Sequence, residues 1–245
     1  MEFDSINVSK LGPFSENQTL LFHGGINLIQ GPPGTGKTTV FRELERRYRE
    51  LFQQRDLPVE LAAKLVFIGE DYGHSERRGE SIVKEGYALS AAPCIRVYPQ
   101  LISYYANQLI APKVLSGGSK FGSADTCGYP FHVSITETGA LEVFDAEGDS
   151  VDRLFQAAGE TFVLSLACNI ALRDVLGFFD PLVVDAGFGM LDESLRRGCH
   201  MGIARTNSQC IYLFSESSAQ NLEIDPDYFL TQIEGNRTCA VPARG

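Results

Sequence analysis

The sequence contains no apolar run that approaches the roughly 20 residues needed to cross a bilayer as a helix. Its start, MEFDSINVSKLG, lacks the basic and apolar segments that define a secretory signal. The six cysteines form no CxxC pair, and the four histidines form no HxxxH or HExxH pattern. These absences exclude a disulfide framework and a zinc site, and they predict mostly buried, reduced thiols. We therefore expect a cytosolic protein without a membrane segment.

Positive charge is also scarce. The formal net charge is −10 at pH 7, from 21 Lys and Arg against 31 Asp and Glu. Nucleic-acid binding across a whole surface needs a basic footprint, so this balance excludes that mode and leaves only a local contact open. The arginines within 42–49 are interleaved with glutamates, which favours an ion-paired, solvated helix face.

The length of 245 residues suits one α/β domain, or such a domain with a modest insertion. Residues 1–30 alternate as strands do, and residues 40–56 have the apolar periodicity of a helix. Short apolar runs predict buried strands at 63–69, 181–185 and 209–214.

The remaining segments predict a hairpin, two helices and an arm. Residues 131–144 are two alternating runs joined by a Thr-Gly turn, which predicts a hairpin. Residues 159–177 are apolar on all sides, as in a buried helix, and a second helix is expected at 192–205. Residues 74–113 predict two helical segments of a short arm, without the heptads of a long coiled coil.

The run GPPGTGKT at 31–38 matches the phosphate-loop pattern GxxxxGK[ST] in full, between a predicted strand and a predicted helix. Glycines let backbone N–H groups wrap around phosphate, and the helix N-terminus adds a favourable dipole. Lys37 is expected to reach the β- and γ-phosphates of ATP, and Thr38 to bind Mg²⁺. The expected nucleotide-binding residues are Gly31, Pro32, Pro33, Gly34, Thr35, Gly36, Lys37, Thr38 and Thr39.

A second magnesium ligand is expected at the end of an apolar strand. PLVVD at 181–185 supplies it, with Asp185 at the carboxyl end where α/β proteins bind ligands. The continuation AGFGMLDE and the opening run FSENQTLLFHGGINLIQGPPGTGKTT together resemble SMC/RecF-type ABC ATPases. The similarity is greatest to their bacterial DNA-modification and DNA-defence branch. It covers the start of the chain and its last third.

The resemblance implies an α/β fold of the P-loop NTPase class, an ABC-ATPase head with a mixed sheet and an N-terminal antiparallel β region. Residues 1–245 would then form one ATPase domain. Residues 1–73 would be the N-lobe with the Walker A loop, and 74–113 a short helical arm. Residues 114–245 would be the C-lobe, with the signature helix, the Walker B strand and the D-loop.

In this family the signature loop begins a long buried helix shortly before the Walker B strand. The stretch LSGGS at 115–119 has the letters of a signature, but the following KFGSADTCGYP cannot form a helix. QAAGE at 156–160 has the required helical context. The resemblance implies that Ala158, Gly159 and Glu160 face the ATP of a second subunit in a head-to-tail sandwich.

The family pattern is broken at several positions. Gln156 and Ala157 replace the usual Leu and Ser of the signature, and Ala186 stands where most relatives have a water-polarising glutamate. Glu216 occupies the switch-histidine position. It is either a substitute that positions water or an exposed glutamate at a strand end. We therefore expect slow hydrolysis, with Lys37 and Asp185 as the other catalytic residues.

Asp192, in the D-loop, is expected along the dimer seam, where it links the two ATP sites, and it can also cap the next helix. The leading hypothesis is an ATP-dependent dimerising switch, homomeric or heteromeric, that acts with DNA or a DNA-processing partner in repair or anti-phage defence. The alternative is a regulatory or scaffold subunit that binds nucleotide without hydrolysing it. A transporter subunit, a nucleotide kinase and a helicase rank lower.

Overall fold

The computed structural model describes residues 1–8, 12–14, 17–53, 57–69, 132–136, 141–145, 147–151, 158–185, 191, 196, 199, 203, 208–214, 228–234 and 237–241. The chain forms two compact units. Unit 1 comprises Met1–Glu70, Asp180–Gly189 and Asn207–Gly245, and unit 2 comprises Asp71–Phe179 and Met190–Thr206.

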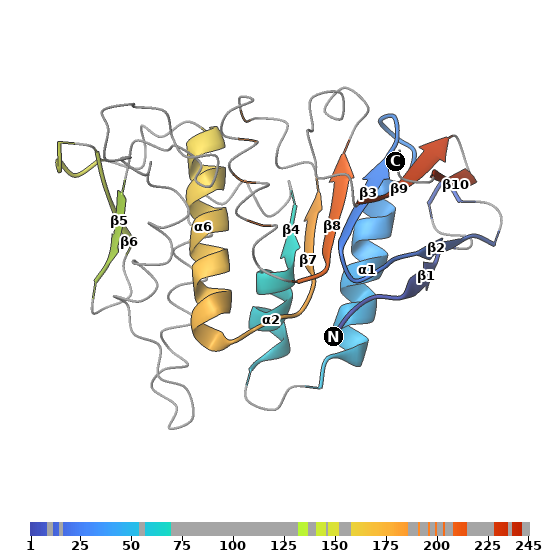
Figure 1. The fold of residues 1–245 in the computed structure, drawn as a ribbon, viewed down its shortest axis with the longest axis horizontal. Helices are drawn as coiled ribbons and strands as arrows, with labels where there is room; N and C mark the ends of the chain where they lie inside the picture. Colours follow the sequence, from blue (N-terminus) through green and yellow to red (C-terminus); the bar gives the residue numbers. More distant parts are fainter. Residues whose placement is uncertain are drawn as a thin grey trace. The chain divides into compact units, whose positions relative to one another are not determined.

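A six-stranded sheet, drawn in Figure 1, forms the centre of unit 1, in the order β10-β9-β3-β8-β7-β4. All neighbouring pairs are parallel except β9 and β10, so the sheet is mixed, as predicted. The strands are β3 (Ile26–Gln30), β4 (Phe67–Ile68), β7 (Leu182–Asp185), β8 (Cys210–Phe214), β9 (Tyr228–Glu234) and β10 (Arg237–Val241).

Two helices lie side by side on one face of this sheet (Figure 1): α1 (Lys37–Leu51) packs on β7 and β8, and α2 (Val59–Val66) on β4 and β7. The buried face of α1 repeats with helical spacing at Val40, Leu44 and Tyr48. Its outer face carries the expected ion pairs, for example Arg49 Nη2 to Glu45 Oε1 at 2.9 Å.

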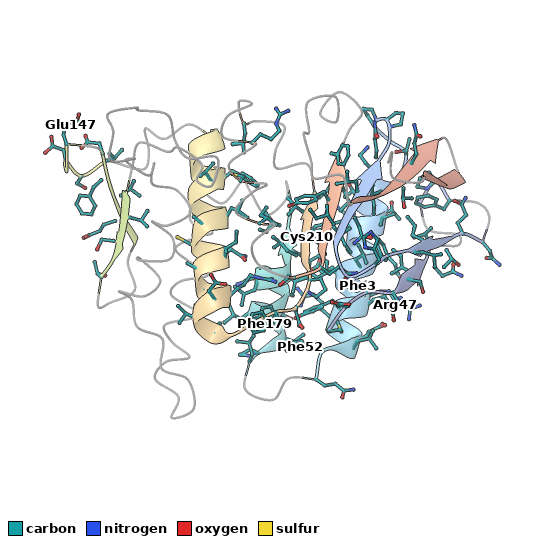
Figure 2. All side chains as sticks on the ribbon, in the orientation of Figure 1. Phe3, Arg47, Phe52, Glu147, Phe179 and Cys210 are labelled. Atoms are coloured by element: carbon teal, nitrogen blue, oxygen red, sulfur yellow. The ribbon has the colours of Figure 1, made fainter. Side chains whose placement is uncertain are left out.

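The N-terminal antiparallel region is confirmed as a separate two-stranded sheet of β1 (Ser5–Asn7) and β2 (Thr19–Leu21). Phe3, labelled in Figure 2, precedes β1. Its backbone N–H donates to Oε1 of the buried Gln209, and its carbonyl accepts from Nε2 of Gln209, both at 2.8 Å. This pair attaches the N-terminal sheet to the residue that precedes β8.

Unit 2 contains the predicted hairpin and the predicted buried helix. β5 (His132–Ile135) and β6 (Leu141–Phe144) pair antiparallel. Helix α6 (Ala158–Leu176) is apolar around most of its circumference and also buries Arg173, whose guanidinium lies 5.3 Å from the centroid of the Phe178 ring. No helix among the described residues is long and apolar enough to cross a membrane.

One predicted strand is shorter than expected, and one helix, α2, and two strands were not predicted. The strand expected at 63–69 is instead the end of α2 followed by the two residues of β4, because a buried helix face and a buried strand read as one apolar run. Strands β9 and β10 do have a sequence signal, a Gly-Asn pair at 235–236 between two strand-like runs.

Other predictions lie partly or wholly outside the described residues. Both the arm at 74–113 and the glycine-rich stretch at 115–119 do so entirely. Within the helix expected at 192–205, Arg196, Cys199 and Ile203 are helical.

Candidate functional site

The predicted phosphate loop and Asp185 lie at the same edge of the sheet in unit 1. The loop continues from Gln30, which is level with Phe214 on β8, and Asp185 on β7 is level with Leu213. The strands β3 and β7 are separated only by β8, and two strand spacings amount to about 10 Å. This is the carboxyl edge of the parallel strands, where open α/β sheets bind ligands.

The loop has the backbone conformation that its glycines were expected to permit. Gly34 and Gly36 have φ angles of 80° and 99°, in the left-handed region that favours glycine. Gly36 is the N-cap of α1, and no side chain caps the helix there. An N-terminus whose first N–H groups lack a side-chain cap is suited to binding an anion such as phosphate.

Lys37 lies over its own loop. Its ammonium donates to the carbonyls of Gly31 at 2.7 Å and Pro32 at 2.8 Å. The hydroxyl of Thr35 also donates to the Pro32 carbonyl at 2.8 Å. The lysine charge is therefore held at the loop, beside the backbone N–H groups that are the candidates for binding phosphate.

Tight packing explains why the first position of the loop must be glycine. A Cβ atom on Gly31 would lie 2.7 Å from the carbonyl oxygen of Ile233 and 2.7 Å from Oγ1 of Thr35. Ile233 belongs to β9 and is buried. No sequence signal pointed to this contact, because it joins residues from opposite ends of the chain.

Thr38 and Asp185 are the candidate magnesium ligands at this edge. Thr38 is exposed, whereas Asp185 is 7% exposed. No group of three His, Cys, Asp or Glu within the described residues could hold a metal ion. A hydroxyl and one carboxylate fit Mg²⁺, which in proteins keeps several waters and phosphate oxygens beside one or two carboxylates.

Gly69 is a further residue of this edge that the sequence reasoning did not assign. The pairing of Ile68 with Val184 puts Gly69 beside Asp185. A Cβ atom on Gly69 would lie 3.1 Å from Cζ of Phe41 and 3.7 Å from Cβ of Asp185. The glycine therefore lets the ring of Phe41 pack close to the carboxylate residue.

The expected signature residues are in unit 2. Helix α6 begins at Ala158, so Ala158, Gly159 and Glu160 form its first turn, as the helical context predicted. Asp192 and Glu216, like 156–157, lie outside the described residues. The structure thus brings together residues 31–39 and Asp185, and it gives no arrangement of these with the signature, Asp192 or Glu216.

No protein-family model and no curated protein matches the sequence. Among solved structures, the SMC head domain from Thermotoga maritima is similar with a TM-score of 0.54 and 10% identity, over 100% of both chains. An Smc head bound to the C-terminal winged-helix domain of ScpA gives a TM-score of 0.64 and 11% identity, over 98% of this chain and 97% of that one. An Smc head with an extended coiled coil, bound to the C-terminal domain of ScpA from Pyrococcus furiosus, has a TM-score of 0.58 and 10% identity. The match covers 97% of this chain and 95% of that one. The predicted fold class is thereby confirmed: this chain has the α/β P-loop NTPase fold of an SMC head domain.

Proposed function

We propose that this protein is an ATP-binding, ATP-dependent dimerising switch of the SMC/RecF type that hydrolyses ATP slowly. The observation that carries the proposal is the phosphate loop, with its left-handed Gly34 and Gly36 and with Lys37 over it, at the same sheet edge as Asp185. The similarity of the fold to SMC heads supports it.

Each loop residue has a distinct task in this proposal. The N–H groups of the loop and the first turn of α1 bind phosphate oxygens, and the Lys37 ammonium moves onto the β- and γ-phosphates. Thr38 and Asp185 hold Mg²⁺, which when bound neutralises charge on the phosphates. Ala186 offers no carboxylate to polarise water, and such help is generally worth about 10²- to 10⁴-fold in rate, so turnover is slow.

The switch arises from binding across a head-to-tail dimer. Ala158, Gly159 and Glu160 at the start of α6 present the positive end of that helix to the γ-phosphate held by the other subunit. In this proposal Asp192, which the family resemblance assigns to the D-loop, lines the seam between the two subunits. ATP favours the closed dimer because only that state adds these contacts, and opening follows hydrolysis.

The dimer transmits its state to a partner in DNA processing, DNA repair or anti-phage defence. Two similar heads were solved with a domain of ScpA bound, which supports a partner protein that docks on the head. With a net charge of −10, local contact or a partner protein is favoured over whole-surface DNA binding.

Sizing the protein with and without ATP and Mg²⁺ tests the proposal. The wild-type mass should double only with both present, and Lys37→Ala should stay monomeric. A single-turnover comparison with Glu216→Gln tests the water-positioning role. An unchanged rate excludes Glu216 from catalysis.

A regulatory subunit that binds ATP without turnover is the second candidate. Ala157, Ala186 and Glu216 favour it, because each stands where the family pattern has a different functional group. Steady-state turnover with Mg²⁺ separates the two functions. A rate equal to that of Lys37→Ala, with ATP still bound to the wild type, supports the regulatory subunit and contradicts the ATPase.

A further inference from the structure

A turn outside the phosphate-loop motif packs directly against the loop. The turn is Gly12–Phe14, in the N-terminal segment between β1 and β2. A Cβ atom on Gly36 would lie 2.7 Å from Cγ of Pro13 and 2.7 Å from Cε2 of Phe14. The Phe14 ring and the Pro13 ring therefore fill the space that a side chain would need at Gly36, the left-handed N-cap of α1.

The same turn also contacts the chain on the C-terminal side of Lys37 and Thr38. Gly12 has a φ angle of 55°, and a Cβ atom there would lie 2.7 Å from Oγ1 and 3.3 Å from Cγ2 of Thr39. The turn thus contacts residues 36 and 39, which bracket the phosphate-binding Lys37 and the magnesium ligand Thr38.

The turn is itself held firmly. Phe14 is 1% exposed. The β1–β2 pairing is extended toward the turn by the hydrogen bond from the Val8 N–H to the Gln18 carbonyl, at 3.0 Å. Beyond the other end of β1, Phe3 is joined to Gln209 by two hydrogen bonds. The N-terminal sheet is therefore attached before β8 at one end and contacts the phosphate loop at the other.

We propose that Phe14 is a positioning residue of the phosphate loop. Its ring holds Gly36 in the left-handed conformation and thereby fixes the backbone shape of the loop. This inference rests on the proposed function of triphosphate binding. Phosphate-binding N–H groups must point at a common centre, and a small rotation at Gly36 misaligns those of Lys37 and Thr38. A packed aromatic ring restrains such a rotation because close-packed interiors transmit displacement.

A matched pair of variants tests the proposal in the full chain. Phe14→Leu loses the ring that touches Gly36, whereas Phe3→Leu changes another buried phenylalanine of the N-terminal segment, which is 4% exposed. Gly12→Ala changes the other contact of the same turn, because it adds a methyl group against Thr39 instead of removing atoms. The measurements are affinity for Mg²⁺-ATP, affinity for inorganic tripolyphosphate, thermal stability, and hydrogen exchange of the amides of residues 34–38 without ligand.

The expected result is a roughly tenfold weaker affinity of Phe14→Leu for both ligands, the effect of misaligning one hydrogen bond to a charged group. Gly12→Ala should weaken both in the same direction, and both variants should speed exchange at 34–38. Phe3→Leu should bind as the wild type does, even where it lowers the melting temperature as much.

Four outcomes separate the possible failures. Equal effects of Phe14→Leu and Phe3→Leu on binding and exchange overturn the positioning role and leave triphosphate binding intact. Weaker binding of ATP but not of tripolyphosphate also overturns it, since the turn would then act on the base or ribose. A wild-type protein that binds neither ligand overturns the proposed function, whereas unchanged exchange at 34–38 in Phe14→Leu overturns only the positioning.

Discussion

The hydroxyl of Tyr48 donates a hydrogen bond of 2.7 Å to Oδ2 of Asp180. Tyr48 is completely buried on α1, and Asp180 stands two residues before β7. The other carboxylate oxygen of Asp180 accepts from the ammonium group of Met1. One carboxylate therefore joins the helix that follows the phosphate loop, the strand that carries Asp185 and the N-terminal segment.

Replacing Tyr48 by phenylalanine should lower the free energy of unfolding by about 1–2 kcal/mol, because a hydrogen bond to a charged group is lost inside the protein. Urea denaturation measures the loss. In an Asp180→Ala background the same replacement should cost much less, since the acceptor is already gone. Equal losses in the two backgrounds would show that the hydrogen bond contributes nothing.

Lys37→Ala should leave the fold intact and weaken ATP binding by at least tenfold, the equivalent of one hydrogen bond to a charged phosphate. The lysine donates to the carbonyls of Gly31 and Pro32, and solvent can replace it there. Calorimetric titration with Mg²⁺-ATP, beside a thermal melt, checks both parts. Unchanged affinity would remove the lysine from the binding site.

The C-terminus of α6 requires a left-handed backbone conformation at Gly177. Its φ angle is 61°, its N–H donates to the carbonyl of Asp174 at 3.2 Å, and the Phe178 N–H donates to that of Arg173 at 2.8 Å. This is the Schellman arrangement. Gly177→Ala should cost about 1 kcal/mol in a urea melt, and Gly177→Asn should cost less because asparagine tolerates the left-handed region. The reverse order would contradict this origin of the cost.

The buried Glu43 predicts a pH dependence of stability. A hydrogen bond from Arg46, at 2.7 Å, is the main cause that lowers the pKa of Glu43 below its ordinary value of 4.5. A lowered folded-state pKa means that the stabilisation is complete above the ordinary pKa and is lost as pH falls through the folded one.

Urea melts of the wild type and Glu43→Gln should therefore differ most near neutral pH, and the difference should shrink below the ordinary carboxyl pKa. Glu142→Gln is a matched control, because Glu142 is an exposed residue of β6. A difference that stays constant down to strongly acidic pH would rule out the ion pair as its source.

Local sequence patterns were sufficient to predict the conformation of the phosphate loop and the strand and helix that flank it. GPPGTGKT predicted a glycine-dependent turn into a helix because the chemistry lies within eight consecutive residues, and Gly34, Gly36 and α1 are found as expected. PLVVD likewise predicted a buried strand that ends at Asp185. The boundary at 63–69 was wrong because apolar residues alone do not distinguish a helix end from a short strand.

Tertiary structure decided which distant segments complete the site. The register that puts Asp185 level with Leu213, the carbonyl of Ile233 against Gly31, and the ring of Phe14 against Gly36 each join residues far apart in the chain. Such contacts depend on how whole helices and strands pack and pair with one another. A short stretch of sequence therefore cannot predict them. The sequence by itself determined that a loop with the phosphate-binding pattern would lead from a strand into a helix, and only the folded chain determined what holds that loop in shape.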